Sequence, residues 1–254
     1  MKLNKITASL VAASAMAFGS SAHAITVGGV TWDENSIFDF SAQTNLYETI
    51  GINVGDSFSG YGQITAVNGS SSFCASCQLT YEFGGYTITK AAAPGDLTFA
   101  ASGGWLKVYV QGFASLSYTA FDPMDKSTAT DGQVWLDLIA TNGILPVGTT
   151  ITGTVTIPNS SGTSGQGAGY FDVAGGLAAA YLDTDGEPGG SDLTYTSSFQ
   201  PIGSSIVNGG VVVATHYGTN EVHGTTQIPE PATLALLGLG LVSLGLARRN
   251  KKVA

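Results

Sequence analysis

The sequence predicts an all-β protein: an antiparallel β-sandwich or jelly-roll-like domain of about ten strands, followed by a single C-terminal hydrophobic helix. Several segments alternate with a period of two, which is typical of a strand with one buried face. Other short runs are rich in β-branched and aromatic residues, which favour strands. Turn-forming pairs that contain glycine, such as Asn68-Gly69 and Asn142-Gly143, separate these runs.

Residues 1–24 have the form of a secretory signal peptide. Two lysines precede an apolar stretch at residues 8–18, and Ala22 and Ala24 supply the small residues of a cleavage site. The apolar stretch is short and rich in alanine and serine, which argues against a retained membrane helix. We therefore expect signal peptidase to cut after Ala24, so that the mature protein begins at Ile25.

The segment at residues 78–89 shows the strand pattern clearly. Leu79 and Tyr81 point to one face of the predicted strand. Thr80 and Glu82 point to the other face. Further β-type runs lie at residues 57–67, 105–111, 134–140, 149–157, 192–199 and 209–217.

We expect residues 25–227 to form one β-rich extracellular domain. No window in this span keeps apolar residues three and four apart for long enough to predict a convincing helix, although residues 46–50 or 176–182 could form a turn. The loop-like stretch at residues 158–169 could instead join two small domains. That alternative leaves neither half with an obvious complete set of strands.

The charge of the domain excludes several classes of partner. Between Ile25 and Gln227 the basic residues are three lysines, and seventeen Asp and Glu residues leave a formal charge of −14. Such a surface repels nucleic acid and anionic lipid headgroups. Without arginine it also lacks the bidentate group that usually binds phosphate or carboxylate. We expect no nucleic-acid partner, whereas cations and neutral sugars stay electrostatically acceptable.

Two cysteines, Cys74 and Cys77, leave three interpretations open. A redox centre would need a helix N-terminus behind the motif, and here the chain runs into a strand. A zinc site would need about four ligands, and adding His216 and His223 gives no recognisable spacing. Export to an oxidising compartment favours the third interpretation, a structural disulfide at a tight turn.

Asp183, Asp185, Glu187 and Asp192 form a weak calcium candidate. An Asp-x-Asp-Gly start clusters hard oxygen ligands on a turn, as calcium loops do. The segment lacks the further ligands of an EF-hand loop, and Pro188 and two glycines interrupt it. The alternative is an acidic, solvated loop, so we expect no cofactor apart from this calcium candidate.

No catalytic pattern stands out, so we expect the protein not to be an enzyme. His216 and His223 would lie on opposite faces of a continuous strand, and we expect surface or turn positions for both. A carboxylate pair for glycoside hydrolysis cannot be identified from sequence, because such a pair depends on distances between strands.

The tail at residues 228–254 combines an apolar run with a basic end. Pro231 to Ala247 carries no charge and would span about 25 Å as a helix, slightly less than a bilayer core. Four basic residues follow within residues 248–252, which places the C-terminus in the cytoplasm and the domain outside. Three glycines lower the stability of this helix, as we would expect of a transient anchor.

Pro229-Glu230-Pro231, the apolar run and Arg248-Arg249 together resemble the PEP-CTERM sorting signal of Gram-negative bacteria that build exopolysaccharide. The resemblance implies that the membrane protease exosortase recognises the tail and removes the helix. It further implies export through the inner membrane, transient anchoring there, and release to the cell surface or the extracellular matrix.

We therefore expect an exported, exosortase-sorted structural or adhesive protein of the cell surface or of a biofilm or floc matrix, with exopolysaccharide as a partner. One alternative is a carbohydrate-binding module with a defined sugar site. A secreted hydrolase that uses a carboxylate pair is another.

Processing at both ends makes the first testable prediction. The intact mass of the protein from its native host should correspond to loss of residues 1–24 and a new C-terminus near Pro231. A mass that retains the chain to Ala254 would show instead a permanent single-pass anchor.

Overall fold

The computed structural model describes residues 24–37, 39–112, 119–156 and 163–228. Nearly all of the predicted signal peptide lies outside these residues. So do the sorting residues Pro229, Glu230, Pro231, Arg248 and Arg249, together with the predicted C-terminal helix. Within the described part of the chain, no helix is long and apolar enough to cross a membrane.

The all-β, antiparallel prediction is confirmed. Nine strands form one sheet in the order β11-β10-β9-β7-β6-β5-β4-β3, with β8 paired to β6 and β9. The strands of this sheet are β3 (Phe40–Thr49), β4 (Ser57–Val67), β5 (Cys77–Lys90), β6 (Thr98–Gly112), β7 (Gln133–Thr141), β8 (Ile151–Val155), β9 (Gly165–Gly175), β10 (Leu193–Asn208) and β11 (Val211–Gly224). A two-stranded sheet pairs β1 (Ala24–Val27) with β2 (Val30–Asp33). The short helices are η2 (Lys126–Ala129) and α2 (Ala179–Leu182).

One of the two segments expected to form a turn is helical, and the other is part of a strand. Residues 176–182 do contain one, because α2 occupies Ala179–Leu182. Residues 46–50 do not, since they continue β3 and its end. Of the stretch at 158–169 that the sequence marks as loop-like, residues 165–169 belong to β9, which pairs directly with β8.

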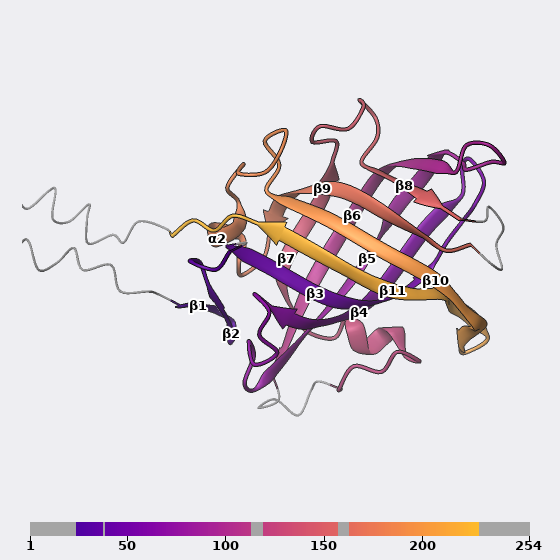
Figure 1. The fold of residues 1–254 in the computed structure, drawn as a ribbon. Helices are drawn as coiled ribbons and strands as arrows, with labels where there is room; N and C mark the ends of the chain where they lie inside the picture. The colour runs from indigo at the N-terminus through magenta and orange to yellow at the C-terminus, as the bar shows by residue number, and fades with distance from the viewer. Residues whose placement is uncertain (1–23, 38, 113–118, 157–162, 229–254) are drawn as a thin grey trace, which may run out of the picture.

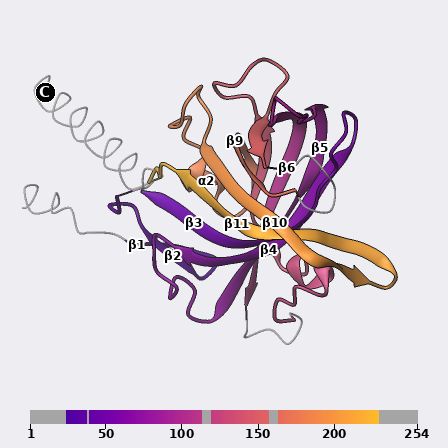
Figure 2. The same ribbon diagram turned by 45° about the vertical axis from the view of Figure 1, so that its right-hand side comes forward.

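The sheet curls until its two ends lie along each other. β3 and β11 stand at opposite ends of the strand order, yet they pack side by side (Figures 1 and 2). The hydroxyl of Thr44 on β3 donates to the side-chain oxygen of Asn220 on β11, and Thr215 donates to the carbonyl of Glu48 over 3.4 Å. The two facing layers therefore belong to one sheet, and the core lies between them.

A buried polar network holds this closure. The hydroxyl of Tyr81 on β5 lies 3.0 Å from the Thr44 hydroxyl and accepts a hydrogen bond of 3.0 Å from the Asn220 amide. It also donates to the carbonyl of Asn45 over 2.8 Å. The three side chains satisfy one another across β3, β5 and β11, which removes the cost of burying unpaired polar groups.

The face assignments for β5 are confirmed, but the second face is also covered in part. Leu79 and Tyr81 are buried in the core. Thr80, on the other face, is fully buried as well, because it lies beneath η2 and donates to the carbonyl of Ala129 over 2.8 Å. Glu82 on the same face pairs with Lys126 of η2.

An aromatic cluster covers the end of the curled sheet at which β3 begins. Trp32 from the β1–β2 hairpin packs edge-on against Phe40 and Trp135, with ring centroids 5.9 and 5.8 Å apart. The Trp135 ring nitrogen donates to the carbonyl of Val27 over 2.9 Å. The Trp32 ring nitrogen donates to Thr226, so the segments at the two ends of the domain meet on one side of the molecule (Figure 1).

A glycine in β4 makes the second testable prediction. A Cβ atom at Gly62 would lie 1.9 Å from the Asn45 carbonyl and 2.8 Å from the Tyr81 ring. We expect Gly62→Ala to lower the free energy of unfolding by about 3 kcal/mol, because the substitution forces apart strands that are already packed. Urea unfolding measures the change. Gly175→Ala is the matched control, since a Cβ atom there meets nothing within 4 Å; equal losses for both variants would contradict the prediction.

Candidate functional site

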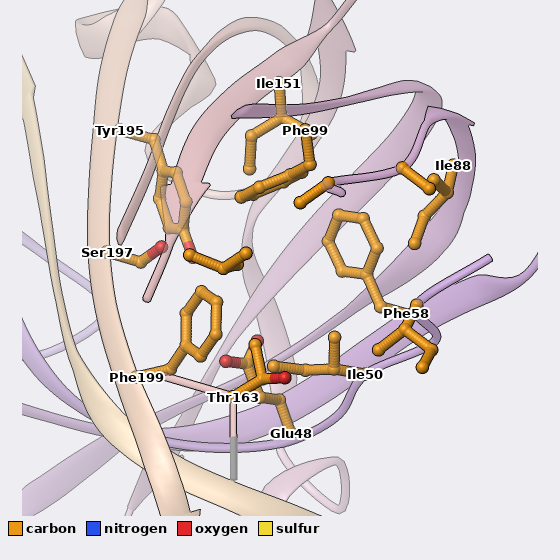
Figure 3. Close-up of a pocket in the computed structure, with 14 residues that line it drawn as sticks. Glu48, Ile50, Phe58, Ile88, Phe99, Ile151, Thr163, Tyr195, Ser197 and Phe199 are labelled. Carbon is orange, nitrogen blue, oxygen red and sulfur yellow. The ribbon is translucent and has the colours of Figure 1, made fainter. Parts of the chain in front are cut away.

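An apolar pocket lies inside the curled sheet, at the end opposite the tryptophan cluster. The ends of β3 and β5, the starts of β4 and β6, and parts of β8 and β10 surround it (Figure 3). The space enclosed is about 50 Å³. Its apolar walls include Ile50, Phe58, Ile88, Phe99, Ile151 and Phe199. Apolar pockets with few polar groups are the usual form of a small-molecule site.

Glu48 is the ionisable carboxyl group in the lining of this pocket. Side chains of β3 alternate, and Ala42, Thr44 and Leu46 all face the core. Glu48 follows in the same register and is 5% exposed. Its Oε1 atom has no hydrogen-bond partner among the described residues. Burying an unpaired carboxyl group costs free energy of folding, so packing alone does not explain a glutamate at this position.

Burial keeps Glu48 in its neutral form. Desolvation raises the pKa of its carboxyl group to about 8, because a charge is poorly solvated inside the protein. Tyr195 also lines the pocket, and burial raises the pKa of its hydroxyl, with the Glu48 charge as a further cause. At neutral pH Glu48 is therefore a hydrogen-bond donor as well as an acceptor.

His216 lies next to this pocket and contradicts the expectation of a surface position. It is 1% exposed, and its ring packs edge-on against Phe199 with centroids 5.9 Å apart. Its Nδ1 atom lies 2.8 Å from the Thr215 hydroxyl. Burial lowers the pKa of His216, and a hydrogen bond with the Thr163 backbone opposes that shift. The expectation failed because β11 packs against β3 and buries one of its faces.

The two histidines do lie on opposite faces of one strand, as the spacing predicted. β11 is continuous from Val211 to Gly224, so His223 points away from His216. His223 lies 3.5 Å from Glu221 on the outer side. Within the described ranges, no three His, Cys, Asp or Glu side chains gather in a way that could hold a metal ion.

The two cysteines lie at disulfide distance immediately before and at the start of β5. The Cα atoms of Cys74 and Cys77 are 5.2 Å apart. This is the geometry that the structural-disulfide interpretation predicts. The neighbouring carbonyl of Phe73 accepts a hydrogen bond from the β2 backbone at Thr31, so the turn is tied to the N-terminal hairpin.

The calcium candidate is organised around Asp192, which is buried. Its two carboxylate oxygens accept backbone N–H bonds from Val173, Thr184 and Asp185, all between 2.6 and 2.7 Å. Asp192 thus holds the loop against β9. Asp183 and Asp185 are exposed, and Glu187 is half-buried. Calcium binding by this loop stays a prediction.

A second hollow, which we call the outer groove, crosses the solvent-facing side of β8, β9, β10 and β11. Its volume is about 800 Å³. The polar side chains that line it are Asn45, Thr154, Thr156, Ser164, Gln166, Ser198, Gln200, Tyr217 and Thr219. Neighbouring hydroxyl groups pair across strands, as Ser198 and Thr219 do over 3.2 Å. No charged side chain lines this groove among the described residues.

Sequence patterns alone missed both hollows. Glu48 looked like one acid among seventeen, and alternation along β3 was the signal that placed it inward. The outer groove draws on strands that are far apart in the chain, so no local motif marks it. Alternating hydroxyl and amide residues at 152–156 and 194–200 were the available signal.

The third testable prediction concerns pH. Because the folded protein keeps the Glu48 proton up to about pH 8 and the unfolded chain loses it near its ordinary pKa of 4.5, stability should fall as pH rises through this window. The expected contribution is about 1.4 kcal/mol for each pH unit. Glu48→Gln should remove it, so that urea unfolding at pH 5, 6.5 and 8 gives a flatter profile. Glu34→Gln is the control, and a wild-type slope in Glu48→Gln would contradict the prediction.

A comparison with known families concerns the C-terminal tail. The family model described as the PEP-CTERM protein-sorting motif matches residues 227–252, which confirms the resemblance stated above. No curated protein matches the chain, and no solved structure matches it. The motif indicates an exported protein that undergoes membrane-associated sorting, with exosortase as the processing partner.

Proposed function

We propose that this chain is a structural or adhesive protein of the cell surface or extracellular matrix, sorted there by exosortase, and that it acts without catalysis. The sorting motif supports export and processing. The observation that carries the proposed role is the distribution of charge on the domain.

Each lysine of the domain is held by an acid. Lys90 pairs with Asp96 over 2.8 Å, Lys107 with Asp137 over 3.0 Å, and Lys126 with Glu82 over 2.5 Å. Three of the seventeen acids are used in this way, which leaves fourteen without a lysine partner. Such a surface stays hydrated and soluble, and divalent cations can bridge it to other anionic matrix components.

The carboxyl groups favour a non-catalytic protein over a hydrolase. Glycoside hydrolysis ordinarily uses two carboxyl groups on either side of the scissile bond. Glu48 is the one carboxyl residue in the lining of the apolar pocket, among the residues that the structure describes. Asp192 is also buried, but its oxygens are occupied by backbone N–H groups.

A carbohydrate-binding module is the second candidate, and the outer groove favours it. Hydroxyl and amide side chains match the hydrogen-bonding groups of an uncharged sugar chain. Tyr217 is 43% exposed in the groove and offers a ring face on which a sugar could stack. Its hydroxyl accepts a hydrogen bond from the Gln200 amide, which orients the ring. The neutrality of the groove contrasts with the acidic surface around it.

One binding experiment tests both candidates and makes the fourth prediction. The full chain is immobilised and exposed to the isolated matrix of its host and to a panel of uncharged polysaccharides, with Ca²⁺ or with EDTA. A structural or adhesive role predicts retention of matrix that EDTA weakens, because cations bridge the acids. A sugar module predicts saturable binding that EDTA leaves unchanged.

Groove variants identify the surface responsible. If the groove binds sugar, Tyr217→Ala and Gln200→Ala should each weaken saturable binding about tenfold or more, through loss of stacking and of an orienting hydrogen bond. Gln133→Ala removes an exposed amide from another part of the sheet and should change nothing. Absence of both matrix retention and sugar binding would overturn both candidates.

A further inference from the structure

The apolar pocket contains a recognition group that the proposed matrix role does not use. We propose that this pocket binds a small organic cation, an ammonium group on a short apolar chain of about two carbon atoms, with the Glu48 carboxyl group as its counter-ion. The inference is independent of the proposed function, since the pocket lies inside the sheet and the matrix contacts lie outside it.

Glu48 places a carboxyl group where a ligand in the pocket can reach it. Its carboxyl group lies at the edge of the pocket space, beside Thr163 and Ile50 and near the ring of Phe199 (Figure 3). The side chain is almost completely buried, and Oε1 has no hydrogen-bond partner among the described residues. A ligand that reaches this atom supplies the partner that the protein leaves out.

Aromatic side chains form much of the pocket wall. Four aromatic side chains from β4, β6 and β10 surround the space, namely Phe58, Phe99, Tyr195 and Phe199 (Figure 3). The faces of aromatic rings carry partial negative charge and attract a desolvated cation. The other polar residues in the described lining are Thr163 and Ser197, which carry hydroxyl groups. An ammonium group therefore meets a carboxyl group, ring faces and hydroxyl acceptors in one place.

Charge selects a cation over a neutral or anionic ligand. Among the residues that the structure describes, no lysine or arginine lines the pocket, and the three lysines of the domain are already paired with acids. An anion would meet Glu48 and an acidic protein without a compensating charge. A neutral alcohol would satisfy Oε1 but would gain nothing from the ring faces or from the field of the protein. A cation gains binding energy from Glu48, from the ring faces and from the field of the acidic protein.

The volume limits the size of the ligand. The space is about 50 Å³. An apolar cavity of about 150 Å³ holds benzene, so this space accommodates an ammonium group with about two carbon atoms. Ala91 and Ala92 are half-buried at the rim, so their small side chains leave room for the apolar end of the ligand. Ethylamine matches these dimensions, and ethanol is its neutral isostere.

Proton release distinguishes this binding mode. At pH 6.5 Glu48 is neutral, and an ammonium ion beside it favours the carboxylate, so binding should release about one proton. The other titratable groups near Glu48 are Tyr81, Tyr195 and His216. Burial raises the pKa of both tyrosines, which keeps them neutral at this pH, and burial also lowers the pKa of His216, which disfavours its charged form.

The test, our fifth prediction, is titration calorimetry of the full chain at pH 6.5 in two buffers of different ionisation enthalpy. We expect ethylamine to bind with release of about one proton, and ethanol to bind at least about tenfold more weakly. Glu48→Gln should weaken amine binding about tenfold or more and abolish proton release. Glu34→Gln makes the same substitution away from the pocket and should behave like the wild type.

A second variant keeps the test decisive if Glu48→Gln fails to fold. Ala92→Phe narrows the rim without changing any charge, and it should weaken binding of the amine and the alcohol alike. The proposal is overturned if the alcohol binds as tightly as the amine, if amine binding releases no proton, or if Ala92→Phe leaves amine binding unchanged.

Discussion

The fold depends on one contact, the packing of β3 against β11 through the buried network of Thr44, Tyr81 and Asn220. These two strands are the ends of the sheet, and no continuous backbone ladder joins them. Hydrogen bonds between side chains therefore hold β3 against β11, whereas backbone hydrogen bonds join the other strands. Because three polar groups satisfy one another inside an apolar core, the register between the first and last strands is specific.

This closure creates two surfaces with different chemistry. On the inside it buries Glu48 and His216, which would be exposed if the sheet stayed open. On the outside it brings Asn45 of β3 beside Thr219 of β11 and completes the outer groove. Residues that alternate along the same strand thus serve opposite faces, and a register shift of one residue would exchange them.

Much of the architecture could be predicted from local patterns. Alternation predicted the strands and the buried face of β5, and glycine-containing pairs predicted turns such as Asn68-Gly69. The pattern failed where a second layer covers an outer face, as η2 covers Thr80. It failed again at His216, because burial there depends on a strand about 170 residues earlier in the chain.

By itself, the sequence determined the strand content, the acidic and arginine-free character of the domain, and the sorting motif of the tail. All of these are local or additive properties of the chain. The tertiary structure decided which acid is buried without a partner and which neutral side chains gather into a groove. The physical reason is that strand pairing and sheet curvature set distances between residues far apart in sequence, and electrostatic and hydrogen-bonding chemistry depends on those distances.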